Sequence, residues 1–269
     1  MLKDITLGQY FPGNSVIHRL DPRTKLIMLV VYIVALFLSD SWITYALMFV
    51  FLATCIAVSR IPLKSFTRGL KPLMLILVFT AVLNLFFTTG EGAPLVDLWI
   101  ITIYSEGIIR AVQMLLRITL LVTATFLLTY TTSPISLTDG LESLMSPLKV
   151  IKVPVHELSM MMCIALRFIP TLIEETDKIM AAQKARGADF ESGNLLQRVK
   201  ALIPILVPLF VSAFRRAAEL ATAMECRCYQ GGDGRTKMKL LRYKRFDLAS
   251  FAVGALLLGA VIVLGRFGM

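Results

Sequence analysis

The stretch "TKLIMLVVYIVALFLSDSWITYALMFVFLATCIAV", residues 24–58, decides the fold because it holds two long apolar runs separated by a short polar turn. Residues 24–39 and 42–58 each approach the roughly 20 residues that a helix needs to cross a bilayer. In lipid an α-helix satisfies its own backbone hydrogen bonds, whereas an open strand does not. The stretch therefore predicts a helical hairpin across a membrane.

The composition of the whole chain supports the same class. Of the 269 residues, 57% are hydrophobic, against roughly 45–50% in soluble domains. The mean hydropathy is +0.74. The net charge of +10 comes from cations that mostly flank apolar runs, as membrane orientation signals do, so we do not expect nucleic-acid binding. The polar start of the chain lacks the pattern of a signal peptide, so the first run is expected to be a retained span.

Three further apolar runs are expected to span the membrane: residues 73–89, 108–130 and 246–265. Residues 60–71 contain Lys and Arg but no acid, whereas residues 91–107 contain Glu and Asp but no cation. Cytoplasmic loops carry the excess of cations. The sequence thus predicts an all-α protein of the cell membrane with about five spans, an internal amino terminus and an external carboxyl terminus.

The middle region breaks this pattern. Residues 158–173 and 201–214 are apolar enough to resemble spans, but crossing at both would place five cations outside: Lys178, Lys184, Arg186, Arg198 and Lys200. Their apolar residues recur at helical spacing on one face, which favours long amphipathic helices at about 154–186 and 204–227. We therefore predict a four-span bundle over residues 1–130, a cytoplasmic domain over 131–245 and a last span over 246–269.

Catalytic and ligand-binding motifs do not occur in the sequence. It contains no phosphate loop, no H-E-x-x-H, no G-x-S-x-G and no acidic pair inside a predicted span. The four cysteines are scattered, and Cys226 and Cys228 have no further ligands nearby. We expect no enzyme activity, no cofactor and no metal.

One arginine falls deep inside a predicted span. Arg117 shares a face of the fourth run with Arg110, and an arginine inside a membrane is costly enough to suggest a specific contact. The candidates are a polar group of the bundle, such as Asn84, or a partner subunit.

The two predicted cytoplasmic helices end alike. "AAQKARGADF", residues 181–190, and "ATAMECRCYQGG", residues 221–232, place Arg186 and Arg227 at matching positions. Two interpretations stay open. A basic residue favours the negative end of a helix dipole and a following glycine caps the helix. Alternatively, an exposed guanidinium suits a carboxylate on a partner protein.

Five motifs along almost the whole chain carry a family resemblance: "HRLDPRTKL" at 18–26, "TTSP" at 131–134, "ALRFIP" at 165–170, "AQKARG" at 182–187 and "MECRCYQGG" at 224–232. Together they resemble the transmembrane T component of energy-coupling factor (ECF) transporters, which take up vitamins and metal ions. The resemblance implies a non-catalytic coupling subunit that binds two ABC-type ATPase subunits and a membrane substrate-binding subunit.

The resemblance also implies docking residues. Ala185, Arg186 and Gly187 match the first Ala-Arg-Gly signature of the family, which docks into an ATPase groove. The second signature keeps Arg227 but has Cys226 and Cys228 in place of alanine and glycine. Because a side chain disfavours left-handed backbone, we expect the second helix to end differently or to continue past Arg227.

A self-contained secondary transporter is the alternative function. It would need an ion or substrate site at mid-membrane, and such sites use broken helices or inward-facing acids. The predicted spans hold no Asp or Glu away from their ends.

Overall fold

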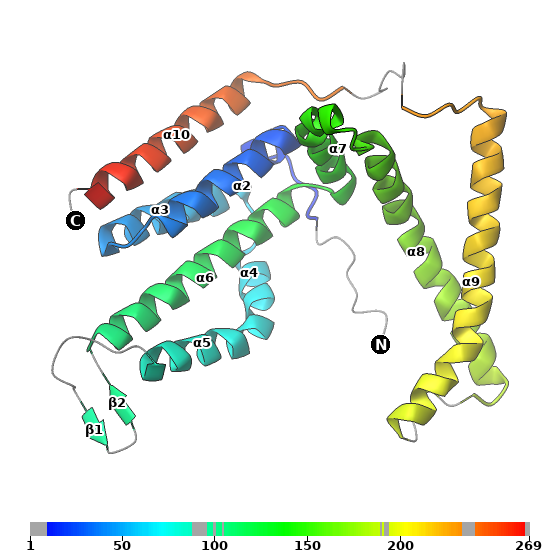
Figure 1. Cartoon of the computed structure of the whole chain (residues 1–269), viewed down its shortest axis with the longest axis horizontal. Helices are drawn as coiled ribbons and strands as arrows, with labels where there is room; N and C mark the ends of the chain where they lie inside the picture. The colour runs from blue at the N-terminus through cyan, green and yellow to red at the C-terminus, as the bar shows by residue number, and fades with distance from the viewer. Residues whose placement is uncertain are drawn as a thin grey trace. The chain divides into compact units, whose positions relative to one another are not determined.

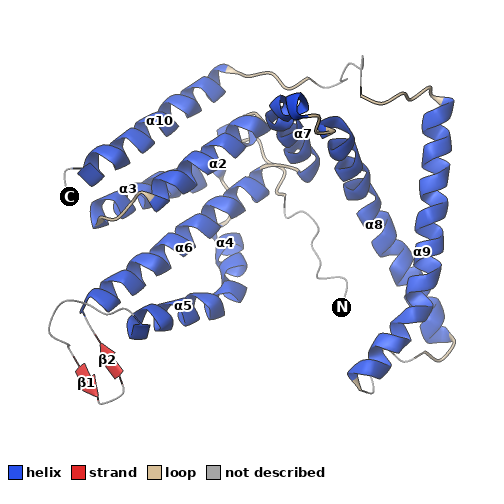
Figure 2. Cartoon of the chain, viewed as in Figure 1, coloured by secondary structure: helices blue, strands red, loops and turns tan. Residues whose placement is uncertain are grey.

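A computed structural model describes residues 10–87, 96–98, 101–103, 105–188, 190, 194–232 and 240–266. Its chain divides into two compact units, which we describe separately: Gly8–Ser143 with Leu241–Met269, and Leu144–Leu240. Most of the predicted acidic loop at 91–107 and the side chain of Arg198 lie outside the described residues. Helices dominate both units, and the strands form one small hairpin (Figure 2).

The first unit is a helical bundle. Its helices are α1 (Val16–Arg19), α2 (Pro22–Phe37), α3 (Trp42–Ser59), α4 (Leu63–Leu70), α5 (Met74–Phe87), α6 (Ser105–Thr131), α7 (Pro134–Met145) and α10 (Arg245–Arg266). A 3-10 turn, η2 (Lys71–Leu73), joins α4 to α5, and strands β1 (Val96–Leu98) and β2 (Ile101–Ile103) pair antiparallel. Helices α2, α3, α6 and α10 run side by side (Figure 1).

Local sequence starts the first two long helices. Asp21 caps α2 by accepting a hydrogen bond from the Arg23 backbone, and Pro22 follows at the first helical position, where a missing N–H costs nothing. Ser41 caps α3 in the same way by accepting from the backbone of Ile43. The polar turn between the two apolar runs therefore both ends one helix and begins the next.

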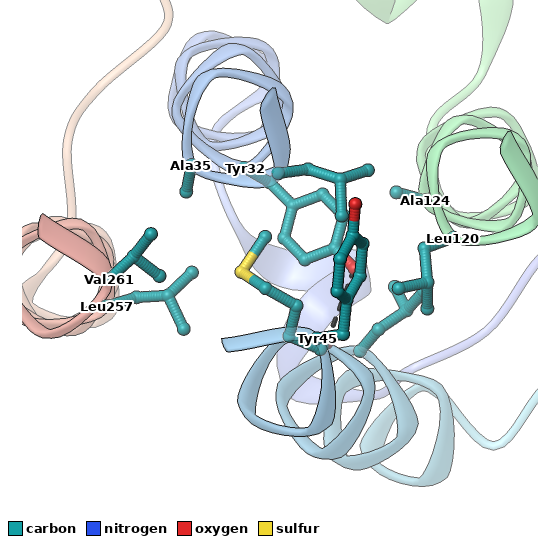
Figure 3. Packing of buried hydrophobic residues seen from close by; sticks show 10 residues of the cluster. Tyr32, Ala35, Tyr45, Leu120, Ala124, Leu257 and Val261 are labelled. Atoms are coloured by element: carbon teal, nitrogen blue, oxygen red, sulfur yellow. Dashed lines mark hydrogen bonds between the residues drawn. The ribbon is translucent and has the colours of Figure 1, made fainter. Parts of the chain in front are cut away.

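The core of the bundle lies where α2, α3, α6 and α10 meet. Its buried side chains come from all four helices: Tyr32, Ala35, Leu36, Tyr45, Met48, Leu52, Leu120, Ala124, Leu257 and Val261 (Figure 3). The Tyr32 hydroxyl donates to the backbone carbonyl of Met48 at 3.3 Å, so its polar atom is satisfied inside this core. Gly254 of α10 permits a close approach, because a Cβ there would lie 2.6 Å from the sulfur of Met28.

A buried polar cluster fastens α10 to the start of α2. The Asp247 carboxylate, 1% exposed, accepts from the backbone N–H of Asp21 at 2.8 Å and of Lys244 at 2.6 Å. Lys25 donates to the last carbonyl of α6, that of Thr131, at 2.8 Å. These contacts satisfy helix ends that would otherwise leave buried backbone groups unpaired.

The second unit consists of η3 (Ser146–Ile151), α8 (Val155–Ala185) and α9 (Leu195–Cys226). Helices α8 and α9 are long and cross each other (Figure 1). Helix α8 has the predicted bounds to within one residue. The predicted start of α9 at Pro204 is wrong, because the helix begins at Leu195 and continues through Pro204 and Pro208.

Six helices in the described part of the chain are long and apolar enough to cross a membrane, judged by length and composition: Trp42–Ser59, Leu63–Phe86, Glu106–Thr131, Val155–Ala185, Val199–Cys226 and Arg245–Arg266. Four of them overlap predicted spans. The remaining predicted span, α2, is 16 residues long. The all-α membrane fold is therefore confirmed, while the cytoplasmic placement of α8 and α9 stays a prediction.

Candidate functional site

Helix α8 ends in a complete glycine-capped turn. The N–H of Gly187 donates to the carbonyl of Lys184 at 3.0 Å, and the N–H of Ala188 donates to that of Gln183 at 3.0 Å. Gly187 has φ +86°, the left-handed conformation that glycine adopts without strain. This pair of bonds is the Schellman motif. Arg186 is the C-cap residue of the helix, and its side chain is exposed.

Helix α9 ends in the same motif. The N–H of Cys228 donates to the carbonyl of Glu225 at 2.8 Å, and the N–H of Tyr229 donates to that of Met224 at 3.0 Å. Arg227 occupies the position that Arg186 has in α8, and its side chain is also exposed.

The expectation that Cys228 changes the end of α9 is wrong. Cys228 takes φ +55°, so it adopts the left-handed backbone that glycine supplies in the first signature. A left-handed residue other than glycine costs roughly 1–2 kcal/mol, which the two hydrogen bonds of the motif offset. The two helix ends therefore present their arginines on equivalent backbone geometry.

The small residues beside each arginine leave it accessible. Ala185 and Gly187 flank Arg186, Cys226 and Cys228 flank Arg227, and all are exposed. Both cysteines are free thiols. No group of His, Cys, Asp or Glu able to hold a metal ion occurs among the described residues. Each helix end therefore presents an exposed cation between two small, exposed residues.

A polar contact fixes the crossing of the two helices. The Glu175 carboxylate of α8 accepts hydrogen bonds from two residues of α9, the Ser212 hydroxyl and the Arg216 guanidinium, the latter at 2.8 Å. The sequence pattern put Glu175 and Arg216 on the polar faces of their helices but did not show that these faces meet. An acid and a base on the polar faces of consecutive long helices were the available signal.

Both helices also expose large apolar side chains. On α8 these include Leu158, Met161 and Met162, and on α9 they are more extensive: Leu196, Val199, Leu202, Ile203, Leu206, Val207, Phe210, Val211 and Phe214. Phe214 is 72% exposed. A contiguous apolar face of this kind marks a surface for lipid or for another protein.

Arg117 lies in the bundle of the first unit. Its guanidinium donates to the carbonyl of Ser39 at 2.9 Å and lies 3.6 Å from the carboxylate of Asp40. The suggested partner Asn84 instead donates to the carbonyl of Thr80 in its own helix. The arginine therefore holds α6 to the turn between α2 and α3, and a contact with a partner subunit stays a prediction.

The buried cluster around Asp247 was not predicted from the sequence. Asp21 and Lys25 stand in the motif "HRLDPRTKL", yet nothing local shows that Asp247, more than two hundred residues away, receives the Asp21 backbone N–H. An acid at the very start of an apolar span was the one available signal. Such a residue usually only caps its own helix, so the signal did not indicate a distant partner.

Comparison with known proteins agrees with this architecture. Residues 13–238 match the model of the CbiQ family, described as cobalt transport protein. The energy-coupling factor transporter transmembrane protein EcfT of Clostridium kluyveri is 54% identical over 266 residues, covering 99% of this chain and 98% of that protein. The protein of the same name from Bacillus subtilis is 48% identical over 262 residues, covering 97% of this chain and 98% of that protein. The chain therefore belongs to the CbiQ cobalt transport protein family, as a transmembrane T component of energy-coupling factor transporters.

Proposed function

We propose that this chain couples ATP hydrolysis by two ABC-type ATPase subunits to the uptake of a vitamin or similar micronutrient. The observation that carries the proposal is the pair of equivalent helix ends, each with an exposed arginine at the same position of a Schellman motif. Two matched ends suit two similar docking grooves. The chain itself carries no nucleotide-binding loop in its sequence, so ATP would be handled by the partners.

Each arginine would act as the anchor of its helix in an ATPase groove. A guanidinium offers a planar set of donors that fits a carboxylate or the carbonyls at a helix end. Ala185, Gly187, Cys226 and Cys228 are small, so they allow the groove to approach the backbone closely. The Schellman hydrogen bonds hold each arginine in a defined place, which lowers the entropic cost of docking.

The substrate-binding membrane subunit would cover the apolar faces of α8 and α9. The exposed leucine, valine and phenylalanine side chains of α9 supply the hydrophobic area that such an interface needs. Because Glu175 ties α8 to α9 at their crossing, a movement imposed on the arginine ends would be carried along both helices.

The charge pattern supports a cytoplasmic position for these helices. If α8 and α9 both crossed the bilayer, Lys178, Lys184 and Arg186 would be translocated, against the positive-inside bias. Docking of these helices to ATPases also requires the cytoplasmic side of the membrane, because ATP is cytoplasmic. Charge and function therefore agree on one orientation.

The test is the double substitution of Arg186 and Arg227 by alanine. Losing one desolvated interfacial charge contact typically costs about 2–5 kcal/mol, so the double variant should release both ATPases from a tagged chain. ATP-driven vitamin uptake in proteoliposomes should fall accordingly. A single substitution should do less, because the remaining helix keeps the partner at high effective concentration.

Arg215→Ala provides the matched control. Arg215 is an exposed cation on α9 outside the helix end, so its loss should leave ATPase retention and uptake unchanged. Wild-type retention and uptake in the double variant would leave both arginines as helix caps. Uptake by the purified single chain would favour a self-contained secondary transporter.

A further inference from the structure

A long apolar groove runs along the bundle between α3, α4 and α6. Its volume is about 540 Å³, within the range of small-ligand sites. Apolar side chains from all three helices make most of its wall, including Leu52, Ile56, Leu63, Phe66, Leu116 and Leu120. Phe49 and Leu63 on its rims are 58% and 68% exposed, so the groove opens to the surroundings of the bundle.

The length of the groove matches one leaflet of a bilayer. Its wall on α3 extends from Phe49 to Arg60. At a rise of 1.5 Å per residue this segment is about 16 Å long, which is close to half of the roughly 30 Å hydrocarbon core. A single acyl chain lying along α3 would therefore reach from the boundary of the membrane to its middle.

A cation stands at the boundary end of the groove. Arg60 is the residue that ends α3, with φ +57°, and its side chain lines the groove and is exposed. Within the described residues its guanidinium has no ion pair. Lys64, Arg68 and Lys71 follow on the next turns, all exposed, and no acid occurs between Asp40 and Glu91 in the sequence.

We propose that this groove binds an anionic phospholipid, with one acyl chain between α3, α4 and α6 and the phosphate on Arg60. An arginine binds phosphate oxygens through two parallel hydrogen bonds. The neighbouring cations of α4 add a field that favours a net negative headgroup over a zwitterionic one. The site joins α4 to the bundle through a ligand, and it does not depend on which proteins bind α8 and α9.

The experiment is native mass spectrometry of the full chain in detergent with equal amounts of palmitoyl-oleoyl phosphatidylglycerol and phosphatidylcholine. Wild-type protein should retain phosphatidylglycerol preferentially. Arg60→Asn removes the charge and keeps a residue that tolerates left-handed backbone. It should lower phosphatidylglycerol retention about fivefold, the worth of one basic residue near an anionic surface, and lower phosphatidylcholine retention less, because that headgroup offers Arg60 a phosphate but has no net charge.

Two pairs of variants separate a site from general attraction. Arg68→Gln removes an exposed cation that does not line the groove, so it should have a smaller effect than Arg60→Asn. Ala53→Phe fills the exposed middle of the groove and should lower retention of both lipids, whereas Val50→Phe, outside the groove, should not. Circular dichroism checks that each variant is folded.

Several results would overturn the proposal. They are equal retention of the two lipids by wild-type protein, an Arg68→Gln effect as large as that of Arg60→Asn, or full retention in Ala53→Phe. Loss of the lipid when the ATPase subunits are added would mean that a partner protein, and not a phospholipid, occupies this surface in the complex.

Discussion

Cys228 shows how one residue can hold a strained backbone at a helix end. Its φ of +55° is disfavoured for any residue with a side chain, yet α9 ends there with both Schellman hydrogen bonds formed. The matching residue of α8 is Gly187, for which a Cβ would meet nothing within 4 Å. Strain at these positions is therefore a matter of backbone conformation and not of crowding.

Cys228→Gly should stabilise the end of α9 by about 1 kcal/mol, because glycine adopts the left-handed region without a steric cost. Hydrogen exchange at residues 224–229 should slow accordingly. Gly187→Ala should have the opposite effect on residues 183–188, by a similar amount. Faster exchange in Cys228→Gly would mean that the thiol itself holds the turn.

His18 predicts a pH dependence outside the membrane spans. Its Nδ1 lies 2.7 Å from the Ser15 hydroxyl, and its Nε2 lies 3.0 Å from the Phe11 carbonyl, so a neutral ring with the proton on Nε2 satisfies both. Burial lowers the pKa of His18 below its usual 6.5, the Phe11 carbonyl opposes this and the charge of Lys25 adds to it. The unfolded chain thus binds the proton more readily.

The contribution of His18 to the free energy of unfolding should be fully present above about pH 6.5. It should be lost as the pH falls through the lowered pKa of His18 in the folded protein. Thermal unfolding at pH 7.5 and pH 5.5 measures this loss. His18→Gln keeps a donor for Phe11 but does not titrate, so its melting temperature should fall less over the same interval. An equal fall in both proteins would assign the pH effect to other groups.

At the scale of elements, the crossing of α8 and α9 is the point at which a polar contact joins the two long helices. Glu175 accepts from Ser212 and Arg216, so a single carboxylate joins the two helices midway along their length. Pro170 lies inside α8, and Pro204 and Pro208 lie inside α9. Each proline removes a helical hydrogen bond, which makes a cross-link between the helices more important for their rigidity.

Glu175→Gln should loosen this crossing, because the amide keeps one hydrogen bond but loses the charge that pairs with Arg216. Spin labels at Ala181 and Thr222, both exposed, should then give a broader distance distribution, and uptake per ATP hydrolysed should fall. Glu219→Gln, an exposed acid on α9, is the matched control and should leave both unchanged. A distribution as narrow as that of the wild type would show that apolar packing alone fixes the crossing.

At the scale of the whole molecule, the orientation in the membrane decides which surfaces could meet the proposed ATPase subunits. The loop charges predict that residues 60–71 and both long helices are cytoplasmic and that the turn at Ser39–Ser41 is external. This assignment uses the distribution of cations and not the hydropathy of the helices, which is high for α8 and α9 as well.

Cysteine labelling in intact cells tests this orientation. In a variant without the four native cysteines, Asp40→Cys should react with an impermeant thiol reagent from outside, because the Asp40 side chain is 93% exposed. Lys200→Cys, also exposed, should react after the membrane is opened and not before. External reaction at Lys200→Cys would place the start of α9 outside and contradict the docking proposal.

The sequence by itself determined most of the long helices, although it put the start of α9 at Pro204 instead of Leu195. Apolar runs predicted α2, α3, α5, α6 and α10 to within three residues, and helical periodicity predicted α8, because hydropathy and capping depend on near neighbours in the chain. The arginine ends were found in the same way, from residues adjacent to one another.

The tertiary structure alone decided which distant groups meet. It paired Glu175 with Arg216, gave Arg117 the Ser39 carbonyl in place of Asn84, and buried Asp247 against the start of α2. It also let Cys228 adopt the backbone of a glycine, against its own preference. These outcomes depend on which helix faces pack together and on hydrogen bonds that offset a local cost, and neither is encoded in the spacing of residues along one helix.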